Sequence, residues 1–363
     1  PSMARVKTDL AILGAVGQLS ISPRTHAGQV APTPTPITTF REWNWGTLGM
    51  RHDSECPTSN RLSGVDGRSV RVGSHQNETK PVHSRVGHIN LLGGTMGTAS
   101  FDEAIAHTPL GDGRFRTSTP SEWLATSRSP GGLVGAQLFT GLQALVPDRN
   151  FRPRSFTSHL LRAPKDGHYE VHAEVLRVGR TLVSLSGRVI QGEKLIATGL
   201  GSFGTDRLGP EFDEMPMPVV EPPSADNETE AYVPDFALPF SKNILLQDRL
   251  GPAPFTAPDG PMERVGWAGF VQPRPVDAAG LVLISDVGMM GWWVRLDRMH
   301  TTATLDHTMH FRADLDGDVP SGMVLMRSRT GLVRGGYLDW DVDIWSQDGT
   351  LLCQSRQLLA VLD

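Results

Sequence analysis

The feature of this sequence that most constrains its fold is an order of segments that occurs twice. An apolar, helix-like stretch is followed by a series of strand-like runs, and the same order returns after a segment rich in proline and acidic residues. The two copies also match in detail, because the turn-and-strand segment 191–197 parallels 347–353, and 158–162 parallels 308–312. An internal repeat of one helix and four or five strands predicts two similar sheets.

The first copy begins with an apolar helix candidate at residues 132–146, which starts after Pro130-Gly131 and stops at Pro147. Strand-like runs follow, separated by turn signals such as Asp166-Gly167. The expected strands are 155–162, 169–176, 181–191 and 195–203. One helix followed by a string of antiparallel strands is typical of the α+β class.

The second copy repeats this order with an apolar helix candidate at residues 277–294. The strands expected after it are 302–312, 323–329, 332–346 and 351–362. Within the third of these, residues 338–344 alternate strictly between apolar and acidic side chains. That alternation predicts a strand with one face on a core and the other face in water.

We therefore expect an α+β fold of two antiparallel sheets, each wrapping a long central helix and joined edge to edge. Pairing the edges would remove unpaired backbone groups that otherwise invite aggregation. The expected boundaries are 96–204 for the first domain, 205–235 for an acidic, proline-rich surface linker and 236–363 for the second domain. Residues 1–95 show no sustained period, so we expect a disordered or non-native extension ahead of Met96.

Composition excludes several classes of protein. The net charge is −5 and no block of lysine and arginine stands out, so we expect no nucleic-acid partner. The two cysteines, Cys56 and Cys353, lie far apart, which excludes a disulfide scaffold and suits a reducing, cytoplasmic location. No apolar run reaches the roughly 18 to 20 residues that a membrane span needs. His307 and His310 are three apart on an expected strand, so they face opposite sides and predict no shared metal.

Several short motifs, taken in order, resemble those of the acyl-CoA thioesterase II family. In the first copy they are Pro130-Gly131-Gly132, the run from Ser155 to Arg162, the turn Arg177-Val178-Gly179-Arg180-Thr181 and the strand end Gly201-Ser202-Phe203. In the second copy they are Ser285-Asp286, the run from Ala303 to Phe311, the run from Gly336 to Leu351 and Ser355-Arg356-Gln357. The sequence departs from the family where Gly131-Gly132 is followed by Leu133 instead of glutamine.

The resemblance implies a tandem double hotdog that hydrolyses acyl-CoA or another acyl thioester without a cofactor or metal. Family members use an Asp on the second hotdog helix, a Thr on a following strand and a Gln on the last strand. The matching positions are Asp286, Thr304 and Gln357. Asp286 would orient a water molecule and act as base, while Thr304 and Gln357 complete its hydrogen bonds. Backbone N–H groups near a helix start could stabilise the developing oxyanion.

The residues themselves give these three positions unequal support. Asp286 is the only carboxylate between residues 281 and 294, and a buried carboxylate is either well hydrogen-bonded for structure or functional. Gln357 shares strand parity with apolar neighbours such as Leu359, so it should face inward, where glutamine is often only a satisfied core residue. Thr304 has the opposite parity from Met309 and faces the core only if a bulge intervenes.

Two other functions stay open at this stage. The chain could be a non-catalytic hotdog that binds acyl thioesters, or a double-hotdog dehydratase or hydratase. A dehydratase or hydratase needs a paired His and Asp, and Asp306 and His310 loosely resemble that pair. The first copy has no acid in its helix and carries Gly201 near the position equivalent to Gln357. We therefore expect one site per chain, in the second domain, and allow for a homo-oligomer.

Overall fold

The computed structural model describes residues 99–125, 127–224, 238–315 and 322–362. All of them belong to the compact unit Gly87–Asp363. The expected extension, residues 1–95, and Met96 lie outside the described residues, as does the end of the expected linker. Among the described helices, none is long and apolar enough to cross a membrane.

In the first half of the described chain, the predicted long helix and the four strands after it are present, and a short helix, two strands and a 3-10 helix that were not predicted precede them. Its elements are α1 (Phe101–Ala104), β1 (Thr108–Gly111), β2 (Arg114–Thr117), the 3-10 helix η1 (Ser121–Trp123), α2 (Gly131–Gln143), β3 (Arg152–Leu160), β4 (Tyr169–Val178), β5 (Leu182–Gln191) and β6 (Lys194–Gly204). Helix α2 starts after its N-cap Pro130, is buried along most of its length and packs on β4, β5 and β6. The predictions for this helix and for β3 to β6 are confirmed.

The second half repeats the order with a shorter helix and more strands than predicted. Its elements are the 3-10 helix η2 (Pro239–Asn243), β7 (Ile244–Leu250), β8 (Glu263–Phe270), α3 (Ala278–Ile284), the 3-10 helix η3 (Gly291–Arg295), β9 (Thr302–Phe311), β10 (Val324–Arg329), β11 (Val333–Arg334), β12 (Tyr337–Trp345) and β13 (Leu351–Val361). The predictions for β9, β10 and β13 are confirmed.

The prediction of one long helix over 277–294 is wrong, because α3 ends at Ile284. The backbone cannot continue as a helix to 294, since Gly288 has φ +66° and Met289 has φ +36°. Left-handed φ values of this kind are incompatible with a continuing α-helix. As a result, Asp286 does not lie on the helix as expected but directly after its C-cap, Ser285.

The prediction of one strand over 332–346 is also wrong. The segment forms two strands, β11 and β12, which pair with each other. Gly335 and Gly336 connect them with φ values of +62° and +81°, which glycine adopts without the steric cost of a Cβ. The sequence therefore turns back on itself within a stretch whose apolar residues suggested one continuous strand.

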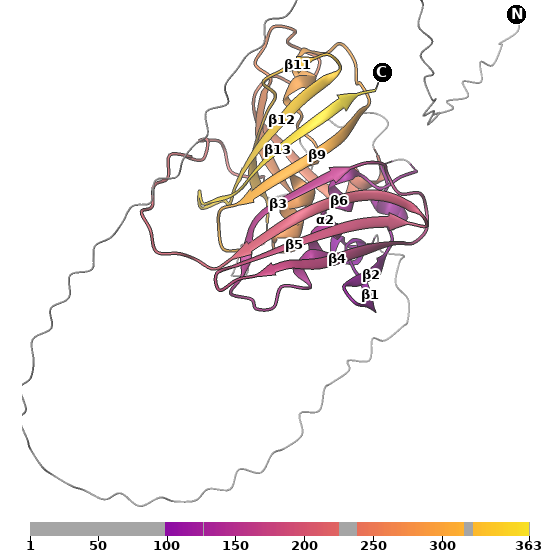
Figure 1. The fold of residues 1–363 in the computed structure, drawn as a ribbon. Coiled ribbons are helices and arrows are strands. Elements are labelled where there is room, and N and C mark those ends of the chain that lie inside the picture. The colour runs from indigo at the N-terminus through magenta and orange to yellow at the C-terminus, as the bar shows by residue number, and fades with distance from the viewer. Residues whose placement is uncertain (1–98, 126, 225–237, 316–321, 363) are drawn as a thin grey trace, which may run out of the picture. The chain divides into compact units, whose positions relative to one another are not determined.

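The described strands form one antiparallel sheet that runs through both halves (Figure 1). The order is β1-β2-β4-β5-β6-β3-β9-β13-β12-β10-β8-β7, with β11 paired to β12 outside this series. The halves join where β3 pairs with β9, for example at Phe156↔Met309 and Ser158↔His307. Counted outward from this junction, each half has its strands in the corresponding order: β3-β6-β5-β4-β2-β1 in the first half and β9-β13-β12-β10-β8-β7 in the second. The predicted edge-to-edge pairing is confirmed, and it makes one continuous sheet of the two expected ones.

The linker after β6 is more than the solvated connector that its composition suggested. Met217 and Val220 pack against an apolar cluster on the face of the sheet opposite to the helices, formed by Leu245, Val265, Trp267, Met323 and Leu325. Indole Nε1 of Trp267 donates to the Glu221 carbonyl at 2.8 Å. Because this segment covers β8 on its second face, nearly every residue of β8 is buried. A strand buried on both faces shows no alternation, which explains why it was not predicted.

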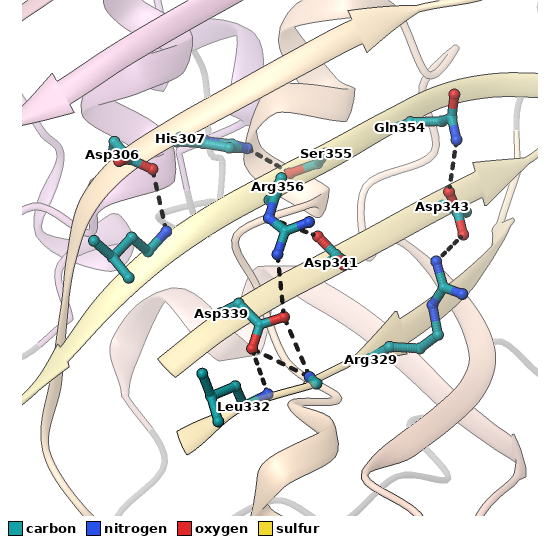
Figure 2. A network of polar contacts seen from close by, with 12 residues as sticks. Asp306, His307, Arg329, Leu332, Asp339, Asp341, Asp343, Gln354, Ser355 and Arg356 are labelled. Atoms are coloured by element: carbon teal, nitrogen blue, oxygen red, sulfur yellow. Dashed lines mark hydrogen bonds and ion pairs between the residues drawn. The ribbon is translucent and has the colours of Figure 1, made fainter. Parts of the chain in front are cut away.

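The acidic face of β12 was expected in water but is largely paired. Figure 2 shows Asp339, Asp341 and Asp343 in a row, with Arg329 and Arg356 facing them. The side chain of Asp343 is only 5% exposed and accepts a hydrogen bond from Arg329 at 3.1 Å. Arg356 lies 3.5 Å from both Asp339 and Asp341. The carboxylates of β12 thus lie in charge pairs with arginines on the outer face of the sheet.

Candidate active site

The Asp286 carboxylate connects the two halves of the molecule. Its Oδ2 accepts a hydrogen bond from the backbone N–H of Gly132 at 2.5 Å, and its Oδ1 accepts one from Oγ1 of Thr304 at 3.3 Å. Gly132 is in the first turn of α2, whose own N-cap, Pro130, supplies no side-chain cap. The first N–H groups of a helix need an acceptor, and a carboxylate at that end is favoured by the helix dipole. Asp286 of the second half therefore caps the helix of the first half.

Two glycines make this approach possible. A Cβ on Gly132 would lie 2.7 Å from Cβ of Asp286, a separation that side chains do not tolerate. A Cβ on Gly131 would lie 2.7 Å from Cδ1 of Leu160 and 3.3 Å from Oδ2 of Asp286. The sequence pattern marked these glycines only as a helix start, and their contact with Asp286 was not predicted. Two adjacent glycines in a first helical turn were the available signal, since glycine lowers helix stability and needs a compensating reason.

Thr304 reaches Asp286 because of a bulge in β9. On β13, Leu358 and Leu359 are adjacent, but their partners on β9 are Asp306 and Thr304. Leu305 is thus the extra residue, and Thr304 comes to face the same side as the buried Leu359. The bulge that this assignment required is confirmed. Bulges re-aim side chains in this way at functional sites.

Gln357 lies in the middle of β13 and is 1% exposed. It pairs across the sheet with His307 on β9 and with Trp340 on β12. Its Nε2 donates to the backbone carbonyl of Ser285 at 2.9 Å, and Ser285 is the residue before Asp286. Its Oε1 is buried and has no hydrogen-bond partner among the described residues. The expected inward orientation of Gln357 is confirmed, and the structure brings it to the Asp286 segment.

Burial raises the pKa of Asp286 from its ordinary value to about 6, and hydrogen bonds from Gly132, Thr304 and Gln357 act in the opposite direction. Asp286 nevertheless keeps some exposure, because the residue is only half-buried. A carboxylate with a pKa near 6 is ionised at neutral pH and is a stronger base than an ordinary aspartate. The arrangement therefore combines a raised basicity with partial exposure of the residue.

The two histidines on β9 face opposite sides, as expected. His307 is 1% exposed, and burial lowers its pKa to about 4, whereas His310 is exposed on the other face. Asp306 shares the face of His310 and accepts a hydrogen bond from the backbone N–H of Leu358. The Asp306 and His310 pair, considered for a dehydratase, therefore points away from Asp286.

Two hollows in the described surface lie apart from these residues. One, of about 50 Å³, includes Phe101 and Arg274 in its lining. The other, of about 340 Å³, lies at the end of α2 and includes Phe151. Neither of these two hollows includes Asp286 or Gln357 in its lining.

Comparison with known families finds a match to each half of the chain. The family model described as the acyl-CoA thioesterase N-terminal domain matches residues 119–204, and the model of the C-terminal domain matches residues 216–361. Together the two models cover more than half of the chain. No curated protein sequence matches the chain.

Solved structures show the same fold. A conserved protein of unknown function with a hot dog fold from Alicyclobacillus acidocaldarius is 24% identical, with a TM-score of 0.66 over 74% of this chain and 99% of that one. A putative thioesterase II from Thermobifida fusca is 23% identical, with a TM-score of 0.62 over 74% of this chain and 100% of that one. An acyl-CoA thioesterase II from Mycobacterium marinum is 20% identical, with a TM-score of 0.56 over 72% of this chain and 96% of that one. The antiparallel sheet of the present chain is therefore of the hot dog type.

Proposed function

Because the chain belongs to the acyl-CoA thioesterase family, we propose that it hydrolyses acyl-CoA or a related acyl thioester, with Asp286, Thr304 and Gln357 as its catalytic residues. One observation carries the proposal. The Asp286 carboxylate is hydrogen-bonded to Gly132 at the start of α2 and to Thr304 on β9, and the Gln357 amide lies against the same segment. A base with a pKa of about 6 thus lies beside the N–H groups of a helix N-terminus.

The proposed architecture is a tandem double hotdog. Its support is the strand order, which is mirrored about the β3–β9 junction, and the packing of α2 on β4, β5 and β6. Helix α3 occupies the equivalent place in the chain order and packs against α2. Only the first of the two helices is long, so the second half would wrap a shorter helix than expected.

In the proposed reaction, ionised Asp286 removes a proton from a water molecule while the water oxygen attacks the carbonyl carbon of the thioester. The π electrons of the carbonyl move to its oxygen, which becomes the oxyanion. When that intermediate collapses, the C–S bond breaks, and Asp286 returns its proton to the thiolate sulfur. The products are a carboxylic acid and a free thiol, so neither a cofactor nor an acyl-enzyme is required.

The other groups would hold the water and stabilise the developing charge. The buried Oε1 of Gln357 is a free acceptor among the described residues and would take the second O–H of the water. The first N–H groups of α2 would stabilise the oxyanion, because helix N-termini favour negative charge. As Asp286 takes up the proton, its negative charge is lost and its hold on the Gly132 N–H weakens, so that donor becomes available as the oxyanion forms.

A single site per chain follows from the asymmetry of the two halves. Helix α2 contains no acidic residue, and Gly201, paired with Phe156, takes the place near which Gln357 would recur. The cytoplasm is the proposed location, since the buried Cys353 is a free thiol and suits a reducing compartment. Lipid metabolism is the process that such a hydrolysis would serve, and a homo-oligomer stays a prediction.

The test is release of free thiol from a series of acyl-CoA esters of increasing chain length, quantified by chromatography. We expect the full chain to hydrolyse part of this series and Asp286→Ala to lose about 10²- to 10⁴-fold in kcat, the usual contribution of a general base. Asp306→Asn is the matched control, because Asp306 faces the other side of the sheet, and it should retain wild-type rates. Equal rates for wild type and Asp286→Ala, or binding of acyl-CoA without thiol release, would contradict the proposal.

A further inference from the structure

A buried histidine lies directly behind the proposed site and contributes no atom to the reaction above. Nε2 of His307 lies 3.0 Å from Oγ of Ser285 and 3.0 Å from Oγ of Ser355. Figure 2 shows the contact between His307 on β9 and Ser355 on β13. Ser285 and Ser355 are both buried, with 0% and 5% of their surface exposed. One imidazole nitrogen therefore joins two serines from different elements.

The two serines are neighbours of the proposed catalytic residues. Ser285 precedes Asp286, and its carbonyl oxygen accepts the hydrogen bond from the Gln357 amide. Ser355 lies two residues before Gln357 on β13, so both side chains point to the same face of the sheet. His307 itself pairs directly with Gln357 across β9 and β13. The imidazole thus contacts the segment that carries Asp286 and the strand that carries Gln357.

We propose that His307 is a positioning residue for the hydrolysis, because its imidazole fixes Ser285 and Ser355 and thereby holds Asp286 and Gln357 at the distance that the reaction needs. The inference rests on the proposed function. It assigns to His307 a role that a satisfied core histidine would not have. A core histidine stabilises the fold as a whole, whereas this one sets the geometry of two particular side chains.

The position of the residue favours this role over simple packing. His307 lies at the junction of the halves, where Ser158 on β3 pairs with it from the other side. Oγ of Ser158 is buried and has no hydrogen-bond partner among the described residues. The imidazole Nε2 therefore directs its contacts toward Ser285 and Ser355 and not toward the adjacent strand of the first half.

Loss of the imidazole should displace Gln357 from the Asp286 segment. We expect kcat of His307→Leu to fall about 10- to 100-fold, the cost of a small misplacement of reacting groups, with little change in KM. The hydrogen bond from Gln357 lowers the pKa of Asp286, so its loss should move the acidic limb of the pH–rate profile to higher pH. His310→Leu is the matched control, since it changes the same residue type on the opposite face of the same strand and should alter neither quantity.

The decisive experiment is a double-mutant cycle with His307→Leu and Gln357→Ala, with kcat measured on an acyl-CoA ester. If His307 acts through Gln357, His307→Leu should reduce kcat in the wild-type background and add little in the Gln357→Ala background. An equal reduction in both backgrounds would overturn the inference. The proposed function fails separately, either if the wild-type chain releases no thiol or if Asp286→Ala releases thiol at the wild-type rate.

Two further variants keep the inference testable if His307→Leu does not fold. His307→Gln retains a hydrogen-bonding group near the position of Nε2, so we expect it to recover most of the wild-type kcat. Ser285→Ala removes one contact of the imidazole while the Ser285 carbonyl that holds Gln357 stays in place. We expect a several-fold fall in kcat for Ser285→Ala that is again absent in the Gln357→Ala background, and additive effects would contradict the role.

Discussion

At the scale of single residues, the site is defined by one carboxylate whose environment opposes its charge. Burial raises the pKa of Asp286 to about 6, although three hydrogen-bond donors partly compensate. A group whose pKa is higher in the folded protein than in the unfolded chain favours folding when it is protonated. That contribution is present at low pH and is lost as the pH rises from about 4 through about 6. At neutral pH the ionised Asp286 therefore costs stability.

A neutral isostere should recover that stability. We expect Asp286→Asn to be more stable than wild type at pH 8 by about 1 to 3 kcal/mol, with the difference disappearing near pH 4. The asparagine Oδ1 can still accept from the Gly132 N–H, and its Nδ2 can donate to the Thr304 hydroxyl, which then becomes the acceptor in that contact. The measurement is urea unfolding of both proteins at the two pH values. A variant that is less stable than wild type at pH 8 would show that ionised Asp286 supports the fold.

The sequence indicated these residues to different degrees. Asp286 could be identified because it is a lone carboxylate in an apolar run, and Gln357 because of its strand parity. Thr304 could be assigned only by resemblance, since the bulge at Leu305 interrupts the period of two on which pattern analysis depends. The contact of Gly132 with Asp286 and that of His307 with Ser285 were not predicted, because residues so far apart in sequence leave no local pattern.

At the scale of elements, the start of α2 is the part of the fold most closely tied to the site. Its first turn lacks a side-chain cap of its own and takes the Asp286 carboxylate in place of one. The beginning of this helix could be predicted from Pro130 and the apolar run after it. The early end of α3 could not, because the apolar pattern continues past Gly288 while the backbone there leaves the helical region.

A methyl group at the start of α2 should separate it from Asp286. In Gly132→Ala the new Cβ would lie 2.7 Å from Cβ of Asp286, so the carboxylate must move. Alanine favours a helix over glycine by about 1 kcal/mol, and the variant should therefore stay folded while kcat falls about 10-fold or more. Gly135→Ala is the control in the same helix, because its Cβ would meet Val282 at 3.3 Å and not Asp286. Circular dichroism and thiol release check the two expectations, and an active Gly132→Ala would argue against the site.

At the scale of the whole described molecule, the repeat explains why the site lies where the halves meet. Two similar units are joined through β3 and β9. This junction brings Asp286, which follows α3, to the start of α2. The internal repeat was enough to predict the edge-to-edge junction. The docking of the linker on β8 and β10 was not predictable, because its proline-rich and acidic composition is that of a solvated segment.

The proposed hydrolysis depends on ionised Asp286 as the base, and the pH dependence of kcat/KM on an acyl-CoA ester tests this most directly. The profile, measured from about pH 4 to about pH 8, reports the pKa of the essential base in the free enzyme. We expect kcat/KM to rise with pH and to reach a plateau with a midpoint near the pKa of Asp286, about 6. A profile that stays flat through this range, or that keeps its midpoint and height in Asp286→Asn, would contradict the account.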